Sequence, residues 1–261
     1  MGKLLAIDGL NIVRRMYEAN VEPDSAEKAE DALNYALAAF RKMLATHQPT
    51  HALAAFDFGG LTWRHALYPQ YREKREPMPP VLRERLPKFY EQLSAIGLVS
   101  VSIAEVEADD VIATAVMRWL TEERGDAIVA STDKDLHVLI AHGALVWDYF
   151  KSEWHDSAWV EKKFGVPPNM LTELLALMGD AADGVPGVSK VGLKTAAKLM
   201  QNYGSVERIM AGAGILKNTL GERLRKDRDM LELSRELVTL KTDVRIGVTW
   251  KQLAFATTSG E

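Results

Sequence analysis

The sequence contains no cysteine, which excludes disulfide bonds and thiolate metal sites. It also lacks an apolar run long enough for a membrane-spanning helix or the core of a secretory signal. Both absences suit a protein of a reducing compartment, so we expect a cytoplasmic location. The six histidines are scattered along the chain, which argues against a zinc site.

An excess of positive charge is missing as well. The 261 residues carry a formal net charge of −4, which argues against indiscriminate binding of nucleic acids. The charges are unevenly distributed, however. Basic side chains gather between Arg64 and Lys88, and no acidic residue occurs from Gly184 to Val206. The acidic residues concentrate around a few short motifs, so charge is expected to act locally.

Short apolar segments alternate with segments of helical period in residues 1–164. The segments KLLAID, HALAAFD, LVSVSI, AIVAS and ALVWDY predict strands. Helices are expected to begin near Ile12, Asp24, Pro80, Asp109 and Asp135. This alternation is typical of an α/β domain with a mainly parallel central sheet flanked by helices. Asp24, with Glu27 three residues later, is the expected cap of its helix.

The second part of the chain has a helical character. Residues 165–255 predict a helical subdomain, with helices in NMLTELLALMG and LKTAAKLMQNYG and a charged helix over about 221–239. Residues 256–261 are expected to form a loose tail. Between Phe58 and Pro80 the periodicity is lost and glycine and proline are frequent, which predicts a long loop with partial helix.

Carboxylates follow four of the predicted strands at their carboxyl ends: Asp8, Asp57, the group Glu107, Asp109 and Asp110, and the pair Asp133 and Asp135. In open parallel sheets this edge forms the ligand-binding crevice. Each acid taken alone also fits the cap of the next helix. Gathered at one edge, the carboxylates would repel one another unless a cation lay among them. A set of oxygen ligands suits Mg²⁺ or Mn²⁺.

A further acidic pair lies where the helical part begins. Asp180 and Asp183 in LMGDAADGVPG are three residues apart, so both can face one side and complete a second cation site. Two metal ions about 4 Å apart would activate water and stabilise the departing oxygen during phosphodiester hydrolysis. Phosphoryl transfer is therefore the reaction that the acidic residues predict.

A glycine turn in residues 184–200, GVPGVSKVGLKTAAKLM, is expected to join two helices. A plain helical hairpin has the same form, but the absence of acidic residues favours contact with DNA phosphates at the start of the second helix. The predicted DNA contacts in this turn are Gly187, Val188, Lys190, Val191, Gly192, Lys194, Thr195 and Lys198.

A basic loop, LTWRHALYPQYREKREPMPP, is the second candidate for phosphate contact. A ring of Tyr71 or Trp63 could stack on an unpaired base. A solvated loop is the alternative, and His65 and His137 are expected to have only surface or packing roles. The side chains expected to meet the scissile phosphate are Arg64, Arg72, Lys74 and Arg75.

Together these segments resemble the 5′ nuclease family, which includes flap endonucleases, phage 5′ exonucleases and the 5′ nuclease domain of bacterial DNA polymerase I. The similarity runs from about Leu4 to Arg245 and is carried by LLAIDGLN, the FD of HALAAFDF, WRHALYPQYREKR, EVEADD, ASTDKDL and GDAADGVPGVSKVGLKTAAKL. It implies a resolvase-like or PIN-like nuclease core and a helical arch over about 68–96. It also implies a DNA-binding subdomain of helix-hairpin-helix type, called a helix-three-turn-helix in this family.

The resemblance also implies the activity, namely flap endonuclease or 5′ to 3′ exonuclease cleavage of DNA with two Mg²⁺ ions. Products would carry a 5′ phosphate and a 3′ hydroxyl, and Mn²⁺ could substitute. Only the resemblance supplies the 5′ polarity. Some short stand-alone bacterial members, of the exonuclease IX type, have lost several acids, whereas this chain retains all nine ligand positions: Asp8, Asp57, Glu107, Asp109, Asp110, Asp133, Asp135, Asp180 and Asp183.

Two positions depart from the family pattern. Arg72 replaces the lysine of Tyr-Lys-x-x-Arg, which keeps the charge but changes its geometry. Lys190 replaces a frequent glycine, which puts a K⁺ site in the turn in doubt. A non-catalytic binder of DNA junctions, a ribonuclease, and a Mg²⁺-dependent phosphatase remain alternatives, although IDGLN lacks the usual Asp-x-Asp of such phosphatases. A monomer that stands free of polymerase domains and cooperates with a polymerase and a ligase is the expectation.

Overall fold

The computed structural model describes residues 2–213 and 219–255, which form two compact units. The chain passes between the units at four places, after residues 60, 75, 154 and 240. Unit 1 therefore comprises residues 2–60, 76–154 and 241–255, and unit 2 comprises residues 61–75, 155–213 and 219–240. The predicted tail, 256–261, lies outside the described residues. No helix of the described ranges is long and apolar enough to cross a membrane.

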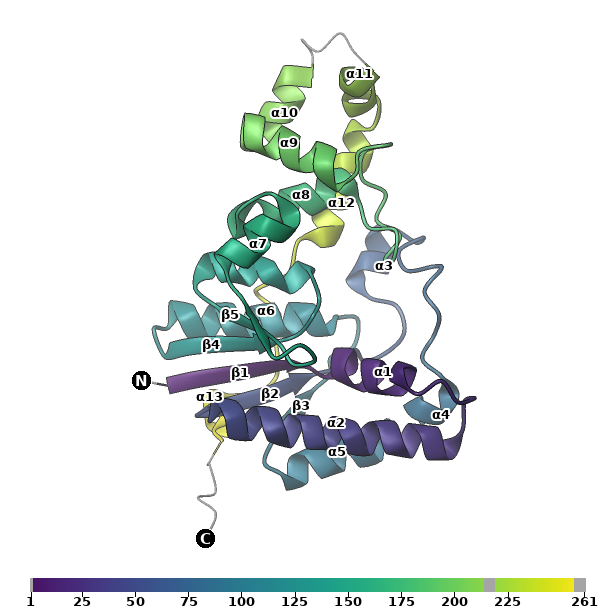
Figure 1. Cartoon of the computed structure of the whole chain (residues 1–261), viewed down its shortest axis with the longest axis vertical. Coiled ribbons are helices and arrows are strands. Elements are labelled where there is room, and N and C mark those ends of the chain that lie inside the picture. Colours follow the sequence, from purple (N-terminus) through teal and green to yellow (C-terminus); the bar gives the residue numbers. More distant parts are fainter. Residues whose placement is uncertain (1, 214–218, 256–261) are drawn as a thin grey trace. The chain divides into compact units, whose positions relative to one another are not determined.

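Unit 1 is built on a six-stranded sheet of described residues in the order β3-β2-β1-β4-β5-β6 (Figure 1). All pairs from β3 through β5 are parallel, which confirms the predicted α/β class with a mainly parallel sheet. The short last strand contains no apolar run and was not predicted. The strands are β1 (Gly2–Asp8), β2 (His51–Ala55), β3 (Val99–Val101), β4 (Gly125–Ala130), β5 (Leu145–Asp148) and β6 (Glu153–His155).

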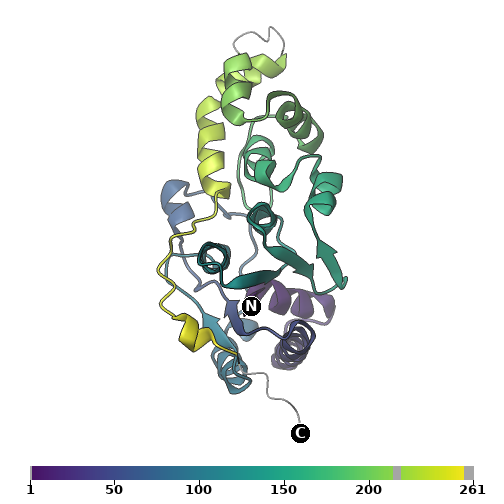
Figure 2. The same ribbon diagram turned by 90° about the vertical axis from the view of Figure 1, so that its left-hand side faces the viewer.

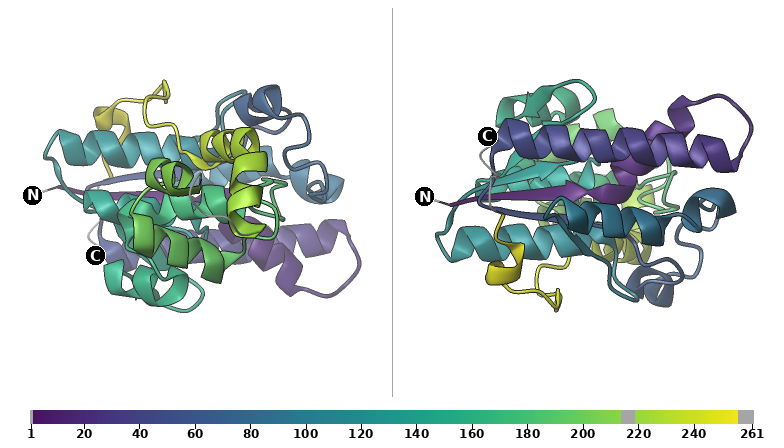
Figure 3. Two further views of the ribbon diagram at one scale, coloured as in Figure 1. Left: turned by 90° about the horizontal axis from the view of Figure 1, so that it is seen from above. Right: turned by 90° about the horizontal axis from the view of Figure 1, so that it is seen from below.

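Apolar side chains on both faces of the central strands explain why these segments read as continuous apolar runs. Leu5 and Ile7 of β1 belong to a core shared with the helices on one face. Helix α6 packs against β1 and β4 on the other face, and Figures 1 and 3 show α2 and α6 on opposite sides. The helices of unit 1 are α1 (Gly9–Ala19), α2 (Ala26–His47), α4 (Pro80–Arg83), α5 (Leu86–Ala95), α6 (Ala108–Thr121) and α13 (Trp250–Leu253).

The start of helix α2 differs from the prediction by one residue. The Ser25 side chain accepts a hydrogen bond from the Lys28 amide at 3.1 Å, so Ser25 caps the helix. Asp24 instead accepts a hydrogen bond from the Tyr17 hydroxyl at 2.7 Å. The predicted cap was therefore wrong, because a tertiary contact uses its carboxylate. The segment from Asp135 is a 3₁₀ helix, η1 (Asp135–His142), and not an α-helix.

Unit 2 is helical, and helix α8 packs against α9 and α12 (green to yellow in Figures 1 and 2). The single charged helix predicted over 221–239 is wrong, because the chain breaks at Asp227 into two helices. The elements of unit 2 are α3 (Trp63–Leu67), α7 (Ser157–Phe164), η2 (Pro168–Met170), α8 (Leu171–Met178), α9 (Leu193–Tyr203), α10 (Val206–Ala213), α11 (Thr219–Lys226) and α12 (Arg228–Val238).

The region predicted as an arch contains helices α4 and α5 after a stretch without helix. Residues 68–75 belong to unit 2 and residues 76–96 to unit 1. The predicted division at residue 164 is linear, whereas the compact units combine segments that are distant in the sequence. The arch and the linear domain boundaries stay predictions.

Candidate functional site

The carboxyl ends of β1 and β4 form the switch point of the sheet, since the strand order runs in opposite directions from these two neighbours. A crevice at such a point is the usual ligand site of an open parallel sheet. Asp8 is the last residue of β1 and lies level with Ala55 at the end of β2. Asp133 follows the end of β4 by three residues. The sheet therefore brings the predicted acids of unit 1 to one edge.

Asp8 is a buried carboxylate with a perturbed proton affinity. It accepts hydrogen bonds from the Asn11 amide at 3.1 Å and the Ser131 hydroxyl at 2.8 Å. Burial, and then the charges of Asp133 and Asp57, raise the pKa of Asp8 to about 7. The two hydrogen bonds oppose this change without cancelling it. Negative charge at this edge is thus incompletely compensated by the protein itself.

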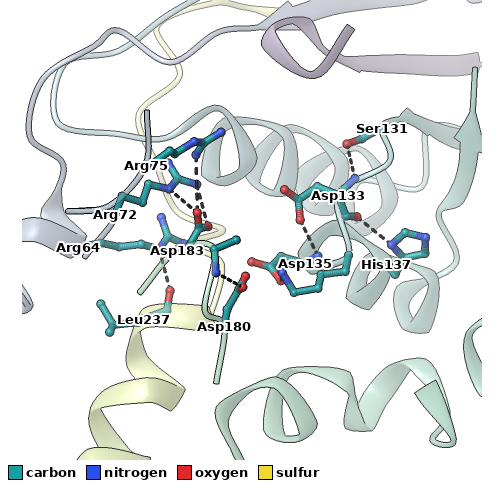
Figure 4. Close-up of polar contacts among 12 residues, drawn as sticks. Arg64, Arg72, Arg75, Ser131, Asp133, Asp135, His137, Asp180, Asp183 and Leu237 are labelled. Carbon is teal, nitrogen blue, oxygen red and sulfur yellow. Dashed lines mark hydrogen bonds and ion pairs between the residues drawn. The ribbon is translucent and has the colours of Figure 1, made fainter. Parts of the chain in front are cut away.

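Ser131 connects the two strand ends, and sequence reasoning missed it. Its hydroxyl donates to Asp8 and accepts a hydrogen bond from the Asp133 amide at 3.0 Å. The Asp133 carboxylate in turn accepts from the Asp135 amide at 3.0 Å, and a His137 ring nitrogen lies 2.8 Å from the Asp133 carbonyl oxygen (Figure 4). These contacts fix the loop after β4, and they give buried His137 the packing role that was expected. A serine inside the ASTDKDL motif was the available signal.

The start of helix α6 carries three of the predicted acids. Glu107 is its cap residue, and Asp109 and Asp110 lie in the first turn, where the helix dipole favours negative charge. Asp57 contacts the same turn, because its carboxylate accepts a hydrogen bond from the Ala108 amide at 2.7 Å. Fully buried Asp110 accepts from the Lys241 amide at 2.9 Å. Asp110 therefore has a structural contact in addition to its predicted role as a metal ligand.

A divalent cation fits this edge in its chemistry. The candidate donors are carboxylate oxygens, which Mg²⁺ and Mn²⁺ prefer, and a cation would relieve the repulsion that raises the pKa of Asp8. Within residues 2–213 and 219–255, however, no three acidic or histidine side chains form a group that could hold a metal ion as they stand. Ligation would therefore require these carboxylates to come closer together than they stand here.

The two acids predicted in unit 2 have different partners (Figure 4). The Asp180 carboxylate accepts a hydrogen bond from the Ala182 amide at 2.9 Å, within a turn closed by Val185. Asp183 forms ion pairs with Arg72 at 3.1 Å and Arg75 at 3.7 Å. Arg72 and Arg75, which were predicted to bind a phosphate, thus neutralise Asp183, which was predicted to bind a metal ion.

Other residues of the basic loop are engaged in packing. Arg64 is buried, donates to the Leu237 carbonyl oxygen at 2.7 Å, and lies over the Trp63 ring. Its contacts give it a structural role at the end of α12, and a catalytic role stays a prediction. Tyr71 is only 3% exposed and packs edge-on against His65. Stacking of Tyr71 on a base would therefore require the loop to open. Lys74 is exposed.

The glycine turn is anchored to helix α12. Gly187 has a φ of 62°, and a Cβ there would lie 2.4 Å from the Gly179 nitrogen. The Gly187 amide donates to the Ser234 hydroxyl at 2.9 Å, and the Ser189 amide donates to Asp227 at 2.8 Å. Hydrogen bonds from Ser189 lower the pKa of Asp227. Neither anchor was predicted, because both lie far along the chain from the turn.

The predicted DNA contacts in the turn separate into exposed and buried side chains. The lysines Lys190, Lys194 and Lys198 are exposed, while Thr195 is half-buried on α9. Val188 and Val191 are 2% and 3% exposed, so only their backbones could contact DNA. Gly192 is the cap residue of α9. Lys190 has a φ of 58°, the left-handed conformation for which glycine is better suited.

Comparisons with known proteins agree with this architecture. Residues 3–165 match the family model of the 5′-3′ exonuclease N-terminal resolvase-like domain, and residues 166–261 match that of the 5′-3′ exonuclease C-terminal SAM fold. The chain is 36% identical to flap endonuclease Xni of Shewanella amazonensis over 94% of each chain. It is 33% identical to flap endonuclease Xni of Psychromonas ingrahamii over 97% of each chain.

Solved structures support the fold. A bacteriophage T5 5′-exonuclease with bound zinc has a TM-score of 0.77 at 20% identity, covering 92% of this chain and 90% of that chain. A T5 flap endonuclease in complex with DNA and metal ions has a TM-score of 0.73 at 19% identity with the same coverage. The two family models together span residues 3–261 and confirm the resemblance found in the sequence. This chain belongs to the 5′-3′ exonuclease family.

Proposed function

We propose that this chain is a structure-specific 5′ nuclease that hydrolyses DNA phosphodiester bonds near 5′ ends with Mg²⁺ or Mn²⁺. The observation that carries the proposal is the carboxylate edge at the ends of β1 and β4, where burial and neighbouring acids raise the pKa of Asp8. Such an edge is unfavourable for the protein alone and favourable around a cation. Family membership supports the same activity.

The metal-holding residues of the proposal lie in unit 1. Bound divalent ions would supply activation of water and stabilisation of the leaving oxygen. Ser131 and Asn11 orient the Asp8 carboxylate, and the Asp135 amide orients Asp133. Whether Asp110, Asp180 and Asp183 contribute stays a prediction. The proposed ligands are Asp8, Asp57, Glu107, Asp109, Asp133 and Asp135.

The proposed duplex contact lies in unit 2. The exposed lysines Lys190, Lys194 and Lys198 would neutralise backbone phosphates without reading sequence, so substrate choice would depend on shape. The T5 relative bound to DNA supports a DNA substrate. A monomeric state, a cytoplasmic location, and cooperation with a polymerase and a ligase are further parts of the proposal.

Cleavage of a 5′-labelled flap duplex tests the activity directly. We expect release of the flap in Mg²⁺ and loss of release both in EDTA and with Asp133→Ala. Asp126→Ala is the matched control, because Asp126 is an exposed acid near the amino end of β4 and should leave cleavage unchanged. Binding of the flap without metal-dependent cleavage would favour a non-catalytic binder of DNA junctions.

The substrate class needs its own comparison. The same flap made of RNA tests the ribonuclease alternative, since backbone contacts do not by themselves exclude a 2′ hydroxyl. A small phosphate monoester tests the phosphatase alternative. We expect DNA to be cleaved faster than either, and faster turnover of RNA or of the monoester would overturn the proposed substrate.

Replacement of all three turn lysines by glutamine tests the duplex contact. We expect weaker binding, with the slope of log K against log salt reduced by about 3. The matched control is Lys162→Gln with Lys163→Gln, two exposed lysines on α7 of the same unit. An unchanged slope in the turn variant would contradict the assignment.

A further inference from the structure

One carboxylate holds the basic loop onto the turn of unit 2. Arg72 Nε lies 3.1 Å from Asp183 Oδ1, and Arg72 Nη2 donates to Asp183 Oδ2 at 3.2 Å (Figure 4). Arg75 Nη1 lies 3.7 Å from the same Oδ1. The Arg72 amide also donates to the Asp183 carbonyl oxygen at 2.9 Å. The loop is thus fixed by a forked ion pair and by a backbone hydrogen bond.

This contact is sheltered and specific to arginine. The side chains of Arg72 and Asp183 are 14% and 16% exposed, so solvent screens their attraction less than at an open surface. Arg72 adopts a φ of 54° and lies over the Tyr71 ring at 5.0 Å. A planar guanidinium can contact both carboxylate oxygens, whereas a lysine ammonium is a single point charge. Arg72 therefore holds Asp183 more firmly than lysine would.

Each side of this ion pair is also predicted to bind a ligand: the arginines an anion, and Asp183 a cation. Arg72 and Arg75 are predicted from the sequence to contact the scissile phosphate of DNA. Asp183, three residues from Asp180, is predicted from the sequence to complete a site for a divalent cation. While the ion pair is intact, the phosphate cannot fully bind the arginines and the cation cannot fully bind Asp183. Whichever ligand binds first bears the cost of breaking it.

We propose that Asp183 is a positioning residue that latches Arg72 and Arg75 in the free protein, and that opening of this latch couples DNA binding to binding of a divalent cation at Asp183. Because the two ligands break the same contact, each raises the affinity for the other, and by linkage the two effects are equal. The inference rests on the proposed function for the identity of the anion. The geometry of the latch is independent of cleavage.

Binding of a 5′-flap duplex in EDTA tests the anion side by fluorescence anisotropy. Asp183→Asn should tighten binding about three- to tenfold, because it frees both guanidinium groups. Asp180→Asn is the matched control, since it removes the same charge from the same turn but leaves the ion pair. In an Arg72→Gln background the gain from Asp183→Asn should shrink, because the main contact is already broken.

Binding of Mn²⁺ to the DNA-free protein tests the cation side by calorimetry. Arg72→Gln should raise the affinity for Mn²⁺ about three- to tenfold, and Arg72→Lys should give an intermediate value. Asp183→Asn should abolish the gain when it is combined with Arg72→Gln. Thermal melts of each variant establish that the fold is retained, and Arg72→Lys keeps the test open if the glutamine variant melts early.

Equal tightening of DNA binding by Asp180→Asn and Asp183→Asn would overturn the latch, since charge alone would then explain the gain. Fully additive effects of the Arg72 and Asp183 substitutions would overturn it as well. Both measurements proceed without cleavage. A protein that showed the coupling but did not cut a flap would retain the latch and lose the proposed function.

Discussion

The carboxylate edge of unit 1 and the glycine turn of unit 2 treat acidic side chains in opposite ways. Burial and neighbouring acids raise the pKa of Asp8 to about 7, whereas hydrogen bonds from Ser189 lower the pKa of Asp227. In the turn, Asp183 is also matched by two arginines. In unit 2, hydrogen bonds and ion pairs within the protein thus stabilise Asp183 and Asp227. In unit 1, the negative charge around Asp8 is left for a bound ligand to compensate. Under the proposed function, this difference gives the first region the chemistry and the second the contact with DNA.

The largest expected effect comes from neutralising the uncompensated region. Asp8→Asn keeps a side chain of similar shape but removes the charge that a divalent cation would need. We expect flap cleavage to fall by at least about a hundredfold in Mg²⁺, since metal stabilisation is worth several kcal/mol in the transition state. Single-turnover assays with saturating enzyme measure the change. If this variant cleaved the flap as fast as the wild type, the carboxylate edge would not be the site of the chemistry.

The next effect is steric and belongs to the turn. Gly187→Ala would place a Cβ 2.4 Å from the Gly179 nitrogen at a φ of 62°, so we expect a loss of about 2–3 kcal/mol in the free energy of unfolding. Gly192→Ala is the matched control, because its Cβ would meet no atom within 4 Å and φ is −98°. Its cost should stay below about 1 kcal/mol. Urea unfolding compares the two, and equal losses would show that the turn is not sterically fixed.

A smaller effect is the pH dependence that Asp8 gives to the stability of the fold. The pKa of Asp8 rises on folding from 3.8 to about 7, so its contribution to stability is complete below pH 3.8 and is lost as the pH rises towards 7. In EDTA, the melting temperature of the wild type should therefore fall between pH 5 and pH 8 relative to Asp8→Asn. Mg²⁺ should reduce this difference. Parallel pH profiles of the two proteins in EDTA would contradict the proposed charge imbalance.

The smallest effect concerns the left-handed Lys190. Lys190→Gly relieves the φ of 58°, and we expect a gain below about 1 kcal/mol in the free energy of unfolding. The lost charge should reduce the salt slope of DNA binding by about 1. Stability and affinity would then change in opposite directions. If both increased, the turn would be a structural element without a share in DNA contact.

The sequence predicted the first five strands of unit 1 and the acidic residues at their ends because parallel buried strands are continuous apolar runs. The convergence of Asp8 and Asp133 followed from the edge rule for parallel sheets and agrees with their electrostatic coupling. The family motifs predicted the fold of the second part of the chain, which the comparisons confirm. Local spacing thus predicted the α/β class of unit 1 and the helical character of the second part, and the family resemblance supplied the particular folds.

Contacts between distant segments were not predictable in the same way. Nothing local indicates that Asp183 pairs with Arg72, that Ser234 holds Gly187, or that Ser131 bridges two strand ends. A carboxylate, hydroxyl or guanidinium pairs with whichever complementary group the fold brings next to it. The buried side chain of Tyr71 shows the same limit, since an aromatic residue among basic ones suggests an exposed ring. Exposure is a property of packing and not of composition.

The contact between Asp110 and Lys241 has a consequence for biosynthesis. Asp110 is fully buried beside the carboxylate edge and accepts a hydrogen bond from the Lys241 amide, while the Thr114 hydroxyl donates to the Lys241 carbonyl oxygen. A buried carboxylate is stabilised by each hydrogen bond that it accepts, and the one from residue 241 becomes available to helix α6 only when that residue has left the ribosome. The edge is encoded early in the chain but matures late in translation. A nascent chain would therefore carry its acidic residues for most of synthesis without a finished site for them.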